Sequence, residues 1–372
     1  GFNTEKIYKT IKKPGVNEYY ISGVVNLTGN IYFGFQGKDL MDETSHVYGF
    51  YRAEIYVDSQ KIFSYKMDRI PFKKGRDINT FIEYKHWVNT KNHFIRSLVE
   101  PNNQLSFYET IHNGIYNFTG KGTKQVKILV SDYHGNTASC TFTVNMNTSR
   151  IAKNRSDIYT DIIPVFDNCY YKENDIIIQF YKNSLYDTLK LRYIKDTVKL
   201  NSRYVSNIHY IHSNVVPIKD SITIKILPKG TIPNNLKNKV HVVEVGSTFD
   251  YNAGGYWDGD FMCTAIKKFG KYALKIDTIP PSIKSIHVYQ GANLSARKCI
   301  FFTITDSGSG IASYDVYIDN TWVIAYLDAK SNLLKVCFQD TRQIQFGKKH
   351  DLLVIVKDRV GNIREFKSNF YK

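Results

Sequence analysis

Two segments near opposite ends of the chain carry the same strand-and-turn pattern. Residues 49–58 and residues 310–319 both begin with Gly and end in Tyr, an aliphatic residue and Asp. Each is followed by a later strand that closes with Asp-x-x-Gly-Asn, at 132–136 and at 358–362. An Asp side chain bonds the backbone N–H groups of its own turn, and Gly adopts the positive φ that a tight reversal needs. The repeat therefore predicts two copies of one unit of strands and hairpins.

Alternation of apolar and polar residues extends this β pattern over the rest of the chain. In residues 51–57 the odd positions can face a core and the even ones water, and 126–130, 222–226 and 314–318 alternate likewise. Aromatic residues form 14% of the chain, with 28 Tyr and 22 Phe, and they favour pleated, half-buried surfaces. Only residues 84–92 favour a helix, inside a long connection between strands. We predict an all-β protein of tandem Ig-like β-sandwich domains.

The length of the chain and the position of a proline pair divide it into three predicted domains. With 372 residues it is too long for one ordinary core. Residues 1–148 form an Ig-like β-sandwich with a long inserted connection at about 66–105, and residues 149–276 form a middle β-sandwich domain. Residues 277–372 form a C-terminal Ig-like β-sandwich, whose opening proline pair, Pro280-Pro281, forces extended backbone.

The chain is strongly basic, with a formal net charge of +16 from 50 Lys and Arg against 34 Asp and Glu. A basic protein concentrates anions such as lipid phosphates or cell-wall carboxylates. The basic residues form neither a helical stripe nor a nucleic-acid-binding signature, so we predict no nucleic-acid partner. No run of about eighteen apolar residues occurs, so we also predict no transmembrane segment.

Five cysteines are widely spaced, with no Cys-x-x-Cys pair. They are Cys140, Cys169, Cys263, Cys299 and Cys337. An odd number argues against a disulfide framework and against a zinc knuckle, so we interpret most of them as buried small apolar residues. One or two bridges stay open in an oxidising compartment, because spacing alone does not choose the partners.

A search for catalytic groups finds no recognisable set. The closest histidines, His209 and His212, would point to opposite faces of a strand, and neither His-x-His nor His-Glu-x-x-His occurs. Residues 307–310 come nearest to a serine nucleophile elbow, but a strand follows them, so we interpret them as a loop. The Asp-x-x-Gly-Asn turns lack the dense carboxylates of a calcium loop. We predict no catalytic residue, no metal ligand and no cofactor site in this chain.

One Gly-rich segment invites a ligand. It contains Tyr256, Trp257, Asp258 and Asp260, which we keep as candidate ligand-binding residues. Paired carboxylates can cleave a glycoside, and aromatic rings beside them can hold a sugar. The alternative, which we favour, is an aromatic corner that packs under a glycine turn.

Several phrases along the chain also match the pattern of a known family. They are Tyr48-Gly49-Phe50-Tyr51 with Glu54-Ile55-Tyr56-Val57-Asp58 and Met67-Asp68-Arg69; Arg76-Asp77-Ile78-Asn79 with Ile82-Glu83-Tyr84; Pro101-Asn102-Asn103-Gln104-Leu105; and Ser309-Gly310-Ile311 with Tyr314, Ile318-Asp319-Asn320, Thr321-Trp322-Val323, Tyr326, Asp328 and Lys330. In these phrases the chain resembles the β-rich region that follows the catalytic domain in one branch of the lysostaphin-type zinc metallopeptidases, peptidoglycan endopeptidases of Gram-negative envelopes. Glu83 stands where the family usually has Asp, and Asn102 where it usually has Gly, so the resemblance is to a diverged member.

The resemblance implies a parent enzyme that cleaves the peptide cross-links of peptidoglycan with one zinc ion, which activates water. The zinc ligands of that family lie upstream of this region, in a His-bearing motif that ends in Asp and in a His-x-His. Neither motif has a counterpart here. Zinc is therefore expected only in a catalytic domain that precedes this region, and no catalytic residue carries over.

Three hypotheses follow from these observations. The leading one is a non-catalytic accessory or targeting region of a cell-envelope peptidoglycan metalloendopeptidase, with peptidoglycan or envelope proteins as its partners. The alternatives are a stand-alone Ig-like adhesin or scaffold protein, and a carbohydrate-active enzyme or carbohydrate-binding module centred on Tyr256, Trp257, Asp258 and Asp260. In each case we expect a periplasmic, outer-membrane-associated or extracellular location.

Overall fold

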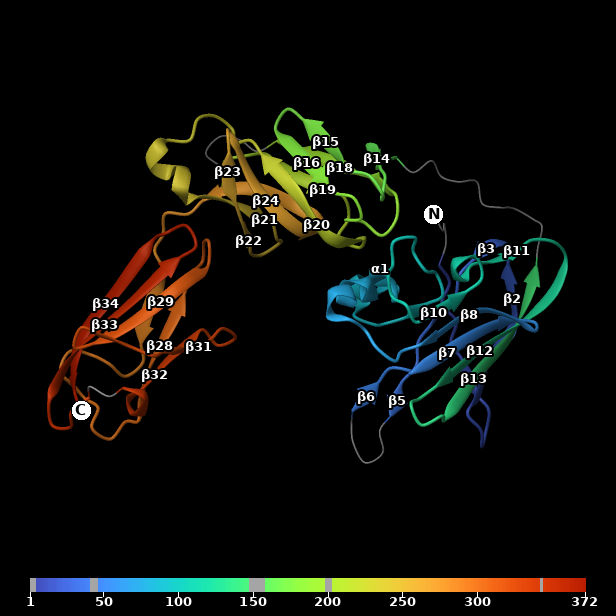
Figure 1. Cartoon of the computed structure of the whole chain (residues 1–372), viewed down its shortest axis with the longest axis horizontal. Helices are drawn as coiled ribbons and strands as arrows, with labels where there is room; N and C mark the ends of the chain where they lie inside the picture. The colour runs from blue at the N-terminus through green and yellow to red at the C-terminus, as the bar shows by residue number, and fades with distance from the viewer. Residues whose placement is uncertain (1–4, 41–45, 147–157, 198–202, 342–343) are drawn as a thin grey trace.

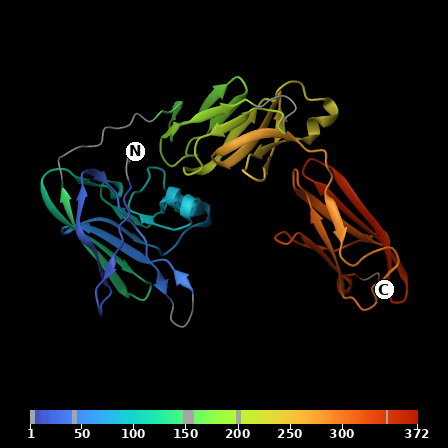
Figure 2. The ribbon, with the colours of Figure 1, turned by 180° about the vertical axis from the view of Figure 1, so that it is seen from behind.

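The computed structural model of the chain describes residues 5–40, 46–146, 158–197, 203–341 and 344–372. Strands form most of its regular structure and fall into three successive units (Figure 1), a succession that Figure 2 shows from behind. The one α-helix in these ranges is α1 (Tyr84–Thr90), inside the segment that the sequence predicts as helical. The protein is all-β, with tandem Ig-like β-sandwich domains, as alternation predicts.

The first unit is built on one seven-stranded sheet. The order of its strands is β1 (Ile11–Lys12), β2 (Glu18–Leu27), β13 (Thr137–Met146), β12 (Gly122–Ser131), β7 (Arg52–Val57), β8 (Gln60–Lys66) and β10 (Tyr108–Thr110). Short pairs complete the unit: β3 (Gly29–Ile31) with β11 (Tyr116–Phe118), β4 (Gly34–Phe35) with β9 (Ile95–Arg96), and β5 (Asp39–Leu40) with β6 (Val47–Tyr48). Phe35 and Phe118 from these short strands, and Phe33 between β3 and β4, share one core with Ile55 and Val126 of the large sheet. The second layer is thus made of short pieces rather than of a second full sheet.

The long inserted connection belongs to this core. It contains the 3-10 helix η1 (Phe72–Thr80), then α1 and β9, and the 3-10 turn η2 (His112–Gly114) lies beyond it. Phe81, Ile82 and Leu105 are buried in the core of the first unit, and the ring centroid of Phe81 lies 5.0 Å from that of Tyr65. These buried apolar residues therefore fix the connection on the first unit. Its polar residues are then positioned to contact the middle unit.

The middle unit is a sandwich of two five-stranded sheets. One has the order β15 (Cys169–Glu173), β16 (Ile176–Phe180), β20 (Pro217–Ile226), β24 (Phe261–Lys268) and β23 (Tyr256–Asp258); the other has the order β18 (Tyr193–Asp196), β19 (Ile208–Ile211), β25 (Gly270–Ile276), β21 (Val240–Glu244) and β22 (Tyr251–Gly254). The short pair β14 (Asp161–Ile163) and β17 (Leu189–Leu191) and the 3-10 helix η3 (Asn234–Lys239) complete it. Ile222, Ile224 and Ile226 on β20 are all fully buried in its core, which confirms the alternation predicted there.

The third unit packs a four-stranded sheet against a five-stranded one. The first has the order β26 (Ser282–Ser285), β28 (Cys299–Thr305), β32 (Leu333–Cys337) and β31 (Tyr326–Asp328); the second has the order β27 (Ala292–Asn293), β34 (Ile363–Tyr371), β33 (Lys349–Asp358), β29 (Ile311–Ile318) and β30 (Thr321–Val323), with η4 (Phe338–Asp340) between β32 and β33. Phe302 and Leu334 from one sheet meet Val316 and Val354 from the other in a common core. This face-to-face burial makes the unit a sandwich.

The repeated sequence pattern corresponds to a repeated topology. The order β2-β13-β12-β7-β8 in the first unit matches β27-β34-β33-β29-β30 in the third, and the first pair of each series is parallel. Each copy of the phrase ends in an Asp at positive φ, 53° at Asp58 and 50° at Asp319. The repeated phrases therefore correspond to a shared order of five strands in the two units.

The Asp-x-x-Gly-Asn motifs form turns as predicted. Oδ1 of Asp132 accepts a hydrogen bond from the N–H of Asn136 at 2.8 Å, and Oδ1 of Asp358 accepts one from the N–H of Asn362 at 2.7 Å. Gly361 adopts a φ of 81°, the left-handed region that a side chain disfavours. The two turns differ in their surroundings, because Asp358 is fully buried and the rest of the turn after Asp132 is exposed.

One residue predicted to face water is buried. Glu54 on β7 is 6% exposed, and its Oε1 lies 2.8 Å from Nη2 of Arg52 and 3.7 Å from Nζ of Lys61. The prediction was wrong because alternation identifies the apolar face only. The two neighbouring cations, Arg52 and Lys61, offset the charge of Glu54, so its carboxylate can be buried on the polar face of the strand.

Two of the five cysteines form a disulfide. Cys299 on β28 and Cys337 on β32 are directly opposite each other in the sheet and are bonded. Cys140, Cys169 and Cys263 are free, and Cys263 is buried. The sequence left this bridge open, since the pairing depends on strand register and not on spacing.

Candidate functional site

The candidate segment 256–260 forms a hairpin end, and its side chains do not share one surface. Tyr256 is 63% exposed on β23, and Trp257, next along the strand, packs against the core of the middle unit. The indole N–H of Trp257 donates to the carbonyl of Lys237 at 2.8 Å. Asp258 pairs with Lys225 at 2.6 Å, and Asp260 lies in the exposed turn that follows. Strand alternation places Trp257 on the face of β23 opposite to Tyr256 and Asp258.

Replacing Trp257 with Ala is expected to lower the free energy of unfolding of the middle unit by about 2 kcal/mol, since a half-buried ring and its hydrogen bond are lost. Thermal unfolding followed by circular dichroism measures the loss. The matched control is Tyr256→Ala, because a ring that is 63% exposed should cost less than about 0.5 kcal/mol. Unchanged stability together with lost binding on a glycan array would favour the carbohydrate-binding alternative instead.

The histidines singled out by the sequence do not act together. His209 is buried on β19, where its Nδ1 lies 2.8 Å from the hydroxyl of Tyr193. His212 follows the strand and lines a cleft of about 490 Å³ with Tyr210 and Lys271. Burial lowers the pKa of both imidazoles to about 4. Two neutral histidines with separate surroundings do not form an acid–base pair.

The structure instead gathers polar side chains at its two domain junctions. At the first junction, Arg76 of the inserted connection donates to the carbonyls of Ile218, Lys219 and Lys267 at 2.7, 2.8 and 3.1 Å. In the opposite direction, the hydroxyl of Tyr186 donates to the carbonyl of Arg76 at 2.5 Å. A guanidinium with three main-chain acceptors is held in a single orientation.

A second group of contacts at the first junction is centred on Asn102, which is 4% exposed. Its Nδ2 donates to the carbonyls of Asn183 and Leu185 at 3.1 and 2.6 Å. Nζ of Lys219 donates to the carbonyl and to Oδ1 of Asn102 at 2.5 and 3.0 Å, and it lies 3.7 Å from Oδ1 of Asp77. Burial lowers the pKa of Lys219, and the charge of Asp77 opposes that shift.

The second junction is organised by Asp277, the first residue after β25. Its Oδ2 accepts from the N–H of Ser309 at 2.6 Å, and its Oδ1 accepts from the N–H of Ile279 at 3.1 Å. Asn362 of the third unit donates to the carbonyl of Asp277 at 3.0 Å. A Cβ added at Gly308 would lie 2.1 Å from Oδ2 of Asp277, so the loop approaches the carboxylate as closely as only Gly allows.

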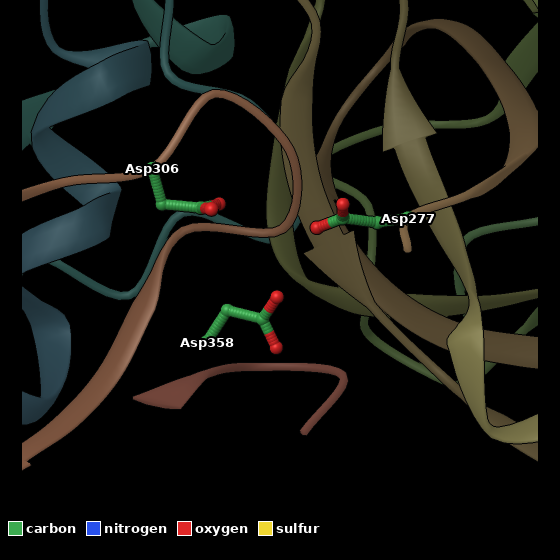
Figure 3. Close-up of side chains that lie close together, drawn as sticks. All are labelled: Asp277, Asp306 and Asp358. Atoms are coloured by element: carbon green, nitrogen blue, oxygen red, sulfur yellow. The ribbon is translucent and has the colours of Figure 1, made fainter. Parts of the chain in front are cut away.

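Two further aspartates point toward Asp277 from the third unit (Figure 3). Asp306 follows β28 and Asp358 ends β33, and one carboxylate oxygen from each of the three residues lies within 4.8 Å of the others. Asp277 and Asp358 are 4% and 0% exposed, and Asp306 is half-buried. Burial raises the pKa of Asp306, and the negative charges of Asp277 and Asp358 raise it further.

This group is the one set of three metal-ligating side chains in the described ranges that lie close enough to share an ion. Three carboxylates can bind a cation or share a proton. Sequence reasoning missed the group, because Asp277 marks the domain boundary, Asp358 fills a turn and Asp306 opens a loop. The available signal was the spacing Asp-x-Gly-x-Gly at 306–310, a loop whose glycines leave N–H groups free to bind carboxylates.

Comparison with known proteins finds one matching family model and no curated relative. A family model described as a Zu5-like domain matches residues 161–277, the middle unit and less than half of the chain. No curated protein matches the chain. In the parts of the chain that the structure describes, no helix has the length and apolar character to span a membrane.

Three of the matching solved structures illustrate how low the sequence identity and the TM-score are. A 1.5-MDa bacterial ice-binding adhesin is 10% identical with a TM-score of 0.16, over 93% of this chain and 92% of that one. A Ca2+-stabilized adhesin of an Antarctic bacterium is 8% identical with a TM-score of 0.17, over 94% and 96%. The human desmocollin-1 ectodomain is 9% identical with a TM-score of 0.18, over 72% and 67%. With values this low, function must be argued from the residues of this chain.

Proposed function

We propose that this chain is a non-catalytic, extracytoplasmic scaffold that acts as an adhesin-like spacer of Ig-like units held in fixed orientation. The observation that carries the proposal is that polar side chains bond both junctions, and that two of them, Asn102 and Asp277, are buried. Arg76 and Asn102 fix the first unit to the second, and Asp277 fixes the second to the third. Hydrogen bonds of this kind are directional, so they favour one angle between neighbouring units.

Two properties of the chain support a location outside the cytoplasm. The Cys299–Cys337 disulfide persists in oxidising compartments and is rare in the cytosol. The net charge of +16 favours contact with anionic envelope polymers and lipids.

A second, finer candidate is the accessory or targeting region of a lysostaphin-type peptidoglycan endopeptidase. The family phrases that carry the resemblance support it, and two of them supply junction residues, Arg76 and Asn102. On this reading the region positions a separate zinc-bearing domain against the wall. The chain itself needs neither zinc nor a catalytic residue for that role.

Small-angle X-ray scattering of the full chain tests the spacer. One narrow distribution of interatomic distances is expected, and a broad distribution typical of freely jointed units would contradict the proposal. Co-sedimentation with purified peptidoglycan sacculi tests the second candidate, since binding without lysis is expected of an accessory region and no binding counts against it. Hydrolysis of the sacculi by the chain alone would contradict both candidates.

A further inference from the structure

The three aspartates at the second junction have no ion-pair partner among the residues that the structure describes. In the described part of the chain, no basic side chain forms an ion pair with Asp277, Asp306 or Asp358. Lys239 reaches the junction, but its Nζ donates to the carbonyl of Val360 at 3.0 Å rather than to a carboxylate. Three close carboxylates, two of them buried, repel one another strongly unless a proton or a cation intervenes.

Two buried polar side chains at the same junction also lack partners. Ser309 is 0% exposed and His241 is 2% exposed, and neither Oγ of Ser309 nor either ring nitrogen of His241 has a hydrogen-bond partner among the described residues. Both belong to segments that hold Asp277. The N–H of Ser309 bonds its carboxylate, and His241 lies on β21 two residues after Lys239, whose carbonyl accepts the N–H of Asp277.

Unpartnered buried polar groups are rare and usually mark a water molecule or an ion. Neither Oγ of Ser309 nor the ring nitrogens of His241 take part in the hydrogen bonds that orient the aspartates, so these side chains are an observation separate from the carboxylates. A hydrated divalent cation at this place would offset two of the three charges, and its water molecules would supply the missing hydrogen bonds. A bare proton shared between carboxylates would balance one charge and leave Ser309 and His241 unpartnered.

We propose that the second junction binds a divalent cation of the calcium type, with Asp277, Asp306 and Asp358 as its protein ligands. Oxygen-only ligands suit a hard cation, and calcium accepts irregular geometry and several waters. Hydrogen bonds from backbone N–H groups already hold each carboxylate, which leaves lone pairs on its oxygens for a metal. Calcium binding itself does not depend on the proposed function. Its expected consequence, a fixed angle between the second and third units, rests on that function.

Isothermal titration of the full, chelator-treated chain with calcium chloride tests the site. One cation per chain is expected, with a dissociation constant of about 10⁻⁴ to 10⁻³ M, the range of extracellular calcium modules. In Asp306→Asn the affinity should fall at least about tenfold, because one charged ligand is lost. Asn keeps an oxygen that can accept from the N–H groups of Gly308 and Gly310, so the loop should stay folded, and circular dichroism checks this.

The control is Asp132→Asn, the same substitution in the Asp-x-x-Gly-Asn turn of the first unit, outside the group of three aspartates. It should leave the titration unchanged. A wild-type chain without calcium binding, or an Asp306→Asn variant that binds as well as the wild type, would overturn the inference. Calcium binding with no change in X-ray scattering would support the site and count against its role in fixing the units.

Discussion

Replacing Lys219 with Met is expected to release the first junction. Met keeps the apolar part of the side chain but removes the ammonium group, which donates to Asn102 and lies 3.7 Å from Asp77. Asp77 is 2% exposed, so its carboxylate would stay buried without its cation. Breaking one side of a buried pair typically costs about 3 to 5 kcal/mol. The two units should therefore separate, and the radius of gyration from X-ray scattering should rise.

A double-mutant cycle separates this effect from a general loss of stability. Adding Asp77→Asn to Lys219→Met removes the orphaned charge, so the double variant should recover part of what the single variant loses. Lys172→Met, at an exposed position on β15 of the same unit, is the control and should behave as the wild type. A Lys219→Met variant with the scattering profile and stability of the wild type would show that the junction contacts do not hold the units.

The sequence predicts the elements of this fold where interactions between neighbouring residues along the chain determine them. Alternation predicts the buried isoleucines of β20, and the repeated phrases predict the matching sheets of the first and third units. The turn at Asp358 follows from the chemistry of Asp, Gly and Asn within five residues. Each of these features depends on neighbours along the chain.

The sequence does not predict the junctions, because their contacts join residues far apart along the chain. Asp277, Asp306 and Asp358 meet through folding of segments far apart in sequence, and each has an ordinary local role. Arg76 and Asn102 lie in a connection that looks like a loop, and only its packing on the first core turns their polar groups toward the middle unit. Sequence patterns report burial and turns, whereas such sites depend on the tertiary arrangement.

Acidification is expected to destabilise the middle unit through His209. This residue is fully buried, and burial lowers the pKa of its imidazole from 6.5 to about 4. In the unfolded chain it therefore binds a proton at a higher pH than in the folded one, so stability is full above pH 6.5 and falls as the pH drops toward 4. The difference in pKa corresponds to a loss of at most about 3 kcal/mol near pH 4.

Denaturant unfolding at a series of pH values measures this slope for the middle unit alone. The chain has three tryptophans, one in each unit, so replacing Trp87 and Trp322 with Phe leaves Trp257 as a reporter of the middle unit. In this background His209→Gln should lower stability at pH 7, since the contact with Tyr193 is altered, and should flatten the slope between pH 6.5 and 4. His134→Gln, in an exposed turn of the first unit, should leave the slope unchanged. An equal slope in His209→Gln and the parent would mean that other groups of the unit, such as His212 or carboxylates, govern its acid sensitivity rather than His209.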